Sequence, residues 1–211
     1  MITTFFVRAR RSALAVGLAV ATLPAMSRAQ SASPTPTPGT VAVRIETSLG
    51  TILAEIDSAH APVSARNFLR YVDSSAYVDG RFHRTVTMDN QPRDTVRIEV
   101  IQGGANPART GARFPAVPLE RTTATGLRHR DGTLSMARGG PDSATSDFFI
   151  CIGDQPSLDF GGHRNLDGQG FAAFGQVTQG MDIVRAIQKQ PANGQTLEPP
   201  IRIVRIERLQ R

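Results

Sequence analysis

The sequence predicts a mainly β protein, a closed antiparallel barrel of seven or eight strands whose ends are capped by two α-helices. Three observations carry this prediction. Apolar and polar residues alternate in many short runs, Gly (19) and Pro (14) are abundant among 211 residues, and only two segments have helical periodicity. The segments do not alternate regularly between strand and helix, which argues against a parallel α/β sheet.

The first 29 residues have the layout of a secretory signal peptide. A basic start ending at Arg11 precedes an apolar run over 13–26, and a small-x-small site ends at Ala29. The apolar run of roughly 14 residues is shorter than the about 20 that cross a bilayer. We therefore expect cleavage after Ala29, a periplasmic or secreted mature protein and no stable membrane insertion after cleavage. An inner-membrane anchor formed by an uncleaved leader is the alternative.

Residues 30–40 form a tract of Ser, Pro and Thr without apolar periodicity, which is typical of an extended linker. The folded domain is therefore predicted over 41–211. Its first elements are strands over 41–47 and 51–56, which form a hairpin across a turn at 48–50. An amphipathic helix follows from Pro62 to about Ser74, because apolar residues there recur at i, i+3, i+4 and i+7. Further strands are predicted over 81–86, 96–101, 132–137, 148–152 and 171–177, then a second helix over 181–189 and a last strand over 201–209.

Charge and cysteine usage exclude several functional classes. The net charge is +6, but four Arg and no acidic residue lie in the first 29 residues, so the rest holds 20 basic against 18 acidic residues. A phosphate-binding nucleic-acid surface is not implied by this near balance. The single Cys151 excludes an internal disulfide and a multi-Cys zinc site.

Common catalytic motifs are also missing. The sequence holds no G-x-S-x-G turn, its four His residues lack metal-ligand spacing, and the glycine pairs at 103–104 and 161–162 do not open predicted helices. We therefore expect neither a metal nor a cofactor.

Four strand segments carry the strongest signal. They are FHR at 82–84, IQGG at 101–104, GTLSMARGGPDSATSDFFI at 132–150 and GFAAFGQV at 170–177. In this order they resemble the cyclophilins, peptidyl-prolyl cis/trans isomerases with an eight-stranded barrel and two capping helices, and the resemblance covers nearly all of 41–211. It implies a closed eight-stranded antiparallel barrel. It also implies an enzyme that assists folding by isomerising Xaa-Pro bonds of exported or unfolded proteins.

The resemblance also implies roles for individual residues. Arg84 corresponds to the catalytic group, Gln102 helps to hold the substrate backbone, and Phe149 forms the floor of the proline pocket. Val100 is a candidate wall residue because strand alternation places it on the face of Gln102. The expected substrate-binding set is Phe82, Val100, Met136, Ala137, Arg138, Phe149, Leu158 and Phe171.

These residue types suit the chemistry. Rotation about an Xaa-Pro bond crosses a barrier of roughly 20 kcal/mol and takes tens of seconds unaided. A donor that bonds the pyramidal prolyl nitrogen in the twisted state lowers this barrier, and a dry pocket holds the ring. One charge-assisted hydrogen bond is worth about 1.5–3 kcal/mol, so an Arg alone is insufficient and apolar walls must contribute.

Three departures from the family pattern stand out. Seventeen residues separate Arg84 from Gln102, and the polar stretch 87–95 is predicted as an extended hairpin tip beside the active face. Glu99 falls where relatives have an apolar wall residue. Asp147 and Arg138 add charge at the groove rim. These changes keep open the alternative of a catalytically weak module that binds proline-containing segments, whereas a barrel-shaped carrier leaves Arg84 and Gln102 without a joint role. We expect a monomer whose partners are proline-containing polypeptides.

Overall fold

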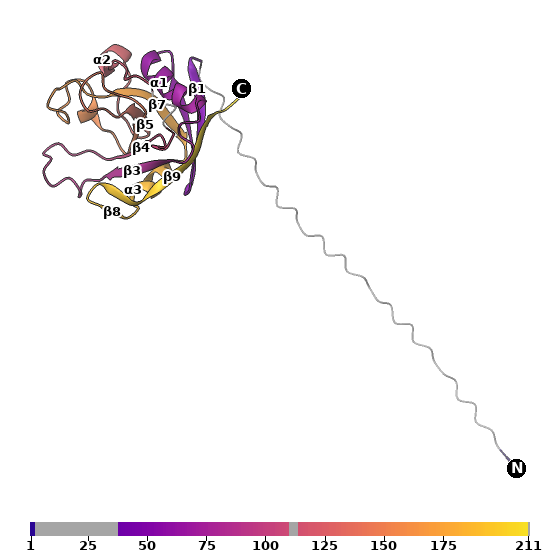
Figure 1. The fold of residues 1–211 in the computed structure, drawn as a ribbon. Coiled ribbons are helices and arrows are strands. Elements are labelled where there is room, and N and C mark those ends of the chain that lie inside the picture. The colour runs from indigo at the N-terminus through magenta and orange to yellow at the C-terminus, as the bar shows by residue number, and fades with distance from the viewer. Residues whose placement is uncertain (3–37, 110–113, 211) are drawn as a thin grey trace. The chain divides into compact units, whose positions relative to one another are not determined.

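A computed structural model describes residues 1–2, 38–109 and 114–210. The predicted leader over 1–29 and the linker over 30–40 therefore lie almost entirely outside the described residues. From Thr40 onward the chain forms a barrel with helices packed against it (Figure 1). No helix within the described ranges has the length and apolar character needed to cross a membrane.

Eight strands close into an antiparallel ring, as expected. Their order is β1-β2-β7-β5-β6-β4-β3-β9, and β9 returns to pair with β1. The two-residue strand β8 pairs only with β9 and lies outside the ring. The bounds are β1 Thr40–Thr47, β2 Gly50–Asp57, β3 Gly80–Val86, β4 Val100–Gly104, β5 Thr133–Met136, β6 Phe148–Cys151, β7 Ala172–Gln179, β8 Ala192–Asn193 and β9 Thr196–Arg208.

Two helices lie where the sequence predicts them and pack against the barrel. Helix α1 (Pro62–Asp73) starts with Pro at its first turn, and the Glu120 carboxylate accepts hydrogen bonds from the backbone N–H groups of Val63 (3.0 Å) and Ser64 (2.7 Å). These bonds satisfy donors that have no partner within the helix. Helix α3 (Met181–Gln188) buries Val184 and Ile187. A one-turn helix, α2 (Thr122–Thr125), and a 3₁₀ turn at Pro156–Leu158 were not expected.

The buried apolar residues divide into two clusters. The large one includes the inward side chains of the strands and Phe68 of α1, whose ring contacts Phe148 at 5.3 Å between centroids. The smaller one lies on strands β4 and β6 and their flanks. Its buried members are Val86, Ile98, Val100, Phe149, Cys151 and Leu158, with Ala137 and Phe171 packed against them.

Strand β4 is shifted relative to the prediction of 96–101, since it covers Val100–Gly104. Ile98, two residues before it, pairs with a side chain instead of a strand. The buried Gln91 amide accepts a hydrogen bond from the Ile98 N–H (3.2 Å) and donates to the Ile98 carbonyl (2.8 Å). The insertion over 87–95 thus supplies the partner that a neighbouring strand would otherwise provide, and it joins β3 to β4 as the predicted hairpin connection.

Candidate active site

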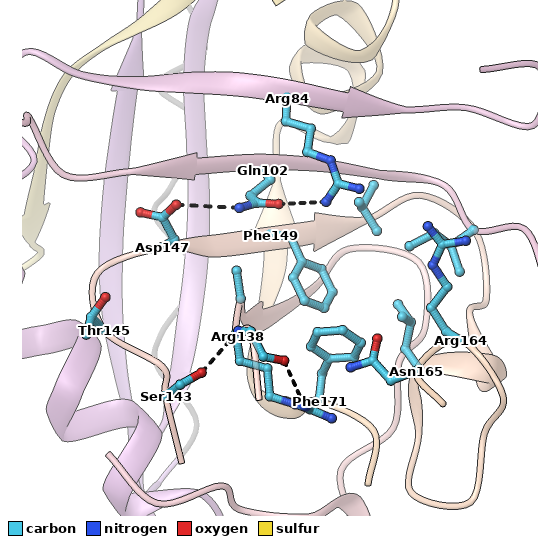
Figure 2. Close-up of a pocket in the computed structure, with 15 residues that line it drawn as sticks. Arg84, Gln102, Arg138, Ser143, Thr145, Asp147, Phe149, Arg164, Asn165 and Phe171 are labelled. Atoms are coloured by element: carbon cyan, nitrogen blue, oxygen red, sulfur yellow. Dashed lines mark hydrogen bonds between the residues drawn. The ribbon is translucent and has the colours of Figure 1, made fainter. Parts of the chain in front are cut away.

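A pocket of about 450 Å³ lies over the smaller cluster, bordered by side chains of β3, β4 and β6 and by the loop that leads into β7 (Figure 2). It brings together both residues predicted to be catalytic and six of the eight predicted to bind substrate. The lining residues are Arg84, Ile98, Val100, Gln102, Ala137, Arg138, Gly139, Ser143, Thr145, Asp147, Phe149, Leu158, Arg164, Asn165 and Phe171.

The Arg84 guanidinium is held at the pocket by two glutamines. Its Nη1 donates to Gln102 Oε1 (2.9 Å), and its Nε (3.0 Å) and Nη2 (2.6 Å) both donate to Gln195 Oε1. Burial lowers the pKa of Arg84 from its ordinary value, nearby Arg164 lowers it further, and Asp94 opposes them. Because both hydrogen-bonding partners are neutral, no carboxylate neutralises the guanidinium directly, and it can donate to a ligand.

An apolar floor faces this guanidinium. The rings of Phe149 and Phe171 meet edge to face, with centroids 5.3 Å apart. Phe149, Val100 and Leu158 are buried beside one another. Two perpendicular aromatic rings and aliphatic walls form a notch that suits a small apolar ring such as proline.

A buried polar chain supports Phe149 from behind. The His129 ring stacks on Phe149 at 6.0 Å between centroids, and its nitrogens bond Asp159 Oδ1 (2.8 Å) and Ser135 Oγ (2.9 Å). Burial alone would raise the pKa of Asp159, but the hydrogen bonds and charge of His129, with Arg128, bring it below its ordinary value. Ser135, His129 and Asp159 are linked in the same sequence as the Ser, His and Asp of a hydrolytic triad. Ser135 is fully buried and cannot reach a substrate, so the three residues serve to support the Phe149 ring.

Arg138 lines the pocket while its own side chain is almost completely buried. It forms a two-pronged ion pair with Asp167 (2.8 and 3.0 Å), donates twice to the Gly170 carbonyl, and lies 5.0 Å from the Phe171 ring centroid. These hydrogen bonds lower the pKa of Asp167. The arginine therefore fastens the chain that presents Phe171, and its charge is compensated.

Two residues expected to contact substrate lie elsewhere. Phe82 and Met136 are buried in the main core, away from the pocket. The register of β3 shifts between Phe82 and Arg84, so the two side chains point to opposite sides although they are two residues apart. Met136 is paired with Phe148 on the core side, and Ala137, one residue later, reaches the pocket. Both expectations are corrected.

Glu99 does not interrupt the apolar wall of the pocket, although it falls where relatives have an apolar wall residue. Its Oε1 accepts a hydrogen bond from Gln188 Nε2 (3.2 Å), away from the pocket, while Ile98 and Val100 form the wall on either side of it. Alternation along the chain from Ile98 to Gln102 could have identified Ile98 as a lining residue.

Three residues at the site were not predicted from the sequence, because their positions depend on contacts between distant segments. Gln195 meets Arg84 across the β3–β9 pairing, and Arg164 and Asn165 reach the pocket from a loop without periodicity. No local pattern in the sequence marks any of them.

Comparison with known proteins now decides the family. Residues 42–209 match the model described as cyclophilin type peptidyl-prolyl cis-trans isomerase/CLD.

The chain belongs to the cyclophilin family.

Curated relatives agree. A peptidyl-prolyl cis-trans isomerase of Acinetobacter baylyi is 33% identical over 171 residues, covering 78% of this chain and 84% of that protein. Peptidyl-prolyl cis-trans isomerase B of Escherichia coli is 33% identical over 147 residues, covering 69% and 83%. This cyclophilin is therefore a peptidyl-prolyl cis/trans isomerase, as the sequence resemblance implied.

Solved structures support the fold. A Cryptosporidium parvum cyclophilin type peptidyl-prolyl cis-trans isomerase, crystallised in the presence of the dipeptide Ala-Pro, matches with a TM-score of 0.64 at 24% identity. The match covers 81% of this chain and 99% of that one. The closed barrel with capping helices is thus the cyclophilin architecture.

Proposed function

We propose that Arg84 and Gln102 are the residues that carry the isomerase activity and that Phe149, Phe171, Leu158 and Val100 hold the proline ring. The observation that carries this proposal is the Arg84 guanidinium, fixed by two neutral glutamines at the rim of an apolar notch. Ala137 and the Arg138 backbone, which also line the pocket, lie where they can border an extended peptide.

In this mechanism no covalent bond is made or broken. The apolar notch holds the prolyl ring while the preceding carbonyl swings, and the Gln102 amide holds the peptide backbone. As the Xaa-Pro amide of the substrate twists, the prolyl nitrogen becomes pyramidal and accepts a hydrogen bond from Arg84. The planar ground state lacks this interaction. Such a bond contributes about 1.5–3 kcal/mol. Exclusion of water and orientation of the substrate supply the remainder.

We propose further that the protein acts outside the cytoplasm on exported or unfolded chains, as a monomer that assists their folding. The basic start, the short apolar run and the small-x-small site over 1–29 support export. Amino-terminal sequencing of the protein purified from its native host tests this. A mature start at Gln30 in the periplasm or medium supports it, and an intact leader in the inner membrane favours the anchored alternative.

Exchange spectroscopy on an Ala-Ala-Pro-Ala peptide tests the catalytic assignment. We expect catalytic amounts of the wild type to accelerate cis/trans exchange, and Arg84→Ala to lose about ten- to a hundredfold of that acceleration. The exposed Arg81→Ala serves as a control on the same strand, because Arg81 lies outside the pocket. Full activity in Arg84→Ala would refute the role of Arg84. Peptide binding by a wild type that leaves exchange unchanged would favour the binding-module alternative.

A further inference from the structure

The charged groups around the pocket are separated by sign. Its lining holds three arginines and one aspartate, and Figure 2 shows Asp147 and Arg164 at opposite ends, with Phe149 and Gln102 between them. Asp167 compensates the charge of Arg138. The electrostatic field along the pocket is therefore set by the other charged lining residues, Arg84, Arg164 and Asp147.

The acidic end is built around Asp147. This carboxylate is 40% exposed, its Oδ2 accepts a long hydrogen bond from Gln102 Nε2 (3.4 Å), and it lies 3.7 Å from His83 Nε2. It sits over Gly104, where an added Cβ would overlap its Oδ1. Among the described residues no arginine or lysine forms an ion pair with Asp147, so no permanent cation neutralises its negative charge at this end of the pocket.

The basic end is built by the insertion that lengthens the β3–β4 connection. Arg164 Nη1 contacts Asp94 Oδ2 (3.0 Å) and donates to the Val96 carbonyl (2.7 Å). Both contacts use Nη1, which leaves Nε and Nη2 without a hydrogen bond to any described residue. The Arg164 side chain is only 11% exposed, whereas Asp94 is 42% exposed and therefore well solvated.

Arg84 adds to the positive field at this end. Its partners are glutamines, and it forms no ion pair with the described carboxylates. The end near Arg164 thus holds two guanidinium groups against one solvated carboxylate, since Asp94 is the only acid bonded there among the described residues.

The spacing fits an extended peptide. Asp147 contacts Gln102 and Arg164 contacts Val96, so the two ends are separated by about six residues of β4 and the segment before it. An extended chain rises about 3.3 Å per residue, so six residues span at most roughly 20 Å. A peptide with its proline over Phe149 can therefore place one residue on each side of the proline within reach of the two charges.

We propose that Arg164 and Asp147 are specificity-determining residues, which make this enzyme prefer Xaa-Pro segments that carry an acidic side chain on one side of the proline and a basic side chain on the other. This inference rests on the proposed function, because it places the substrate in the same pocket. The insertion over 87–95 acts in this recognition by holding Arg164 in place.

Three end-blocked peptides test the preference: Lys-Ala-Pro-Ala-Glu, Glu-Ala-Pro-Ala-Lys and the neutral Gln-Ala-Pro-Ala-Gln. Exchange spectroscopy gives kcat/KM for each. Exposed ion pairs change an equilibrium by about 1.5- to 5-fold each, so we expect about a fivefold difference between the two charged orders at low salt. The difference should shrink in 0.5 M NaCl, where charges are screened within about 4 Å. The faster order also reveals the direction in which the chain binds.

Five variants, one of them a control, identify the residues responsible for the preference. Arg164→Gln and Asp147→Asn should each reduce the difference between the charged orders, and the double variant should abolish it. Arg164→Lys keeps the positive charge but not the planar guanidinium, so it should retain the preference for one charged order. If Arg164→Gln is unstable, this variant separates the effect of the charge from the effect of the side-chain packing. Arg97→Gln removes the same charge from an exposed site on the connection and should change nothing.

Equal rates for the two charged orders in the wild type, or a difference that persists in the double variant, would overturn the inference. Neither result affects the proposed function, which is tested by the neutral peptide. If the wild type fails to isomerise that peptide, the proposed function fails, whatever the charged peptides show.

Discussion

Replacing Arg84 by Lys separates the role of a positive charge from the role of a shaped donor. In the wild type the guanidinium makes three hydrogen bonds to Gln102 and Gln195 at 2.6–3.0 Å. These bonds fix its plane at the rim of the pocket. A Lys ammonium keeps the charge, but it is a single strongly hydrated point that cannot bond both glutamines in this geometry and also reach the prolyl nitrogen.

The expected loss follows from the bond that forms only in the twisted state. That bond is worth about 1.5–3 kcal/mol, which corresponds to roughly ten- to a hundredfold in rate. Arg84→Lys should therefore lower kcat by nearly as much as Arg84→Ala and change KM little, because the apolar notch that binds the ring is untouched. Exchange spectroscopy at several peptide concentrations measures both constants, and thermal unfolding checks that the variant is folded.

An Arg84→Lys enzyme with kcat within threefold of the wild type would refute this reasoning. It would mean that the positive field of the site, which Lys preserves, is sufficient for catalysis. A rise in KM at unchanged kcat would equally contradict it, since Arg84 would then act in binding the planar ground state.

Three other predictions follow from the hydrogen bonds and burial described above. Gln195→Ala removes two of the three bonds that orient Arg84, so kcat should fall about three- to tenfold at nearly constant KM; a change in KM alone would contradict a positioning role. Burial raises the pKa of the Cys151 thiol, so iodoacetamide at pH 8 should label it in urea but not in the native protein, as mass spectrometry can verify. His129 keeps the pKa of Asp159 below its ordinary 3.8, so this carboxylate stabilises the fold above that pH, and its contribution is lost as the pH falls through the lowered pKa. Urea unfolding between pH 6 and pH 3 should show a smaller loss of stability in Asp159→Asn than in the wild type, and parallel curves would argue against the assignment.

Sequence reasoning succeeded where the information is local. Alternation identified the opening hairpin, helical spacing identified α1 and α3, and short contiguous motifs singled out Arg84, Gln102 and Phe149, which the fold brings to one pocket. The expectation for Phe82, which came from the family resemblance, failed because the register shift in β3 places Phe82 and Arg84 on opposite sides of the sheet. Such a shift arises from the pairing of distant strands and leaves no local trace.

The pocket was less predictable than the barrel because most of its lining residues come from connections between strands. Arg164 lies in a loop without periodicity, and its position depends on Asp94 of the insertion and on Val96 directly after it. The same holds for the start of β4, since the Gln91 amide pairs with Ile98 in place of the neighbouring strand that the pattern over 96–101 predicts. Contacts between two irregular segments carry no repeating signature that a single sequence can reveal.

The pairing of β1 with β9 has a consequence for the order of synthesis. The ribosome makes β1 early and β9 after every other strand described here, so a growing chain cannot complete the ring until β9 emerges. Until then β1 and β3 each present an unsatisfied edge, and such edges are templates for aggregation. A message truncated before Thr196 would therefore yield an open sheet, and its product would be recognisable by its insolubility.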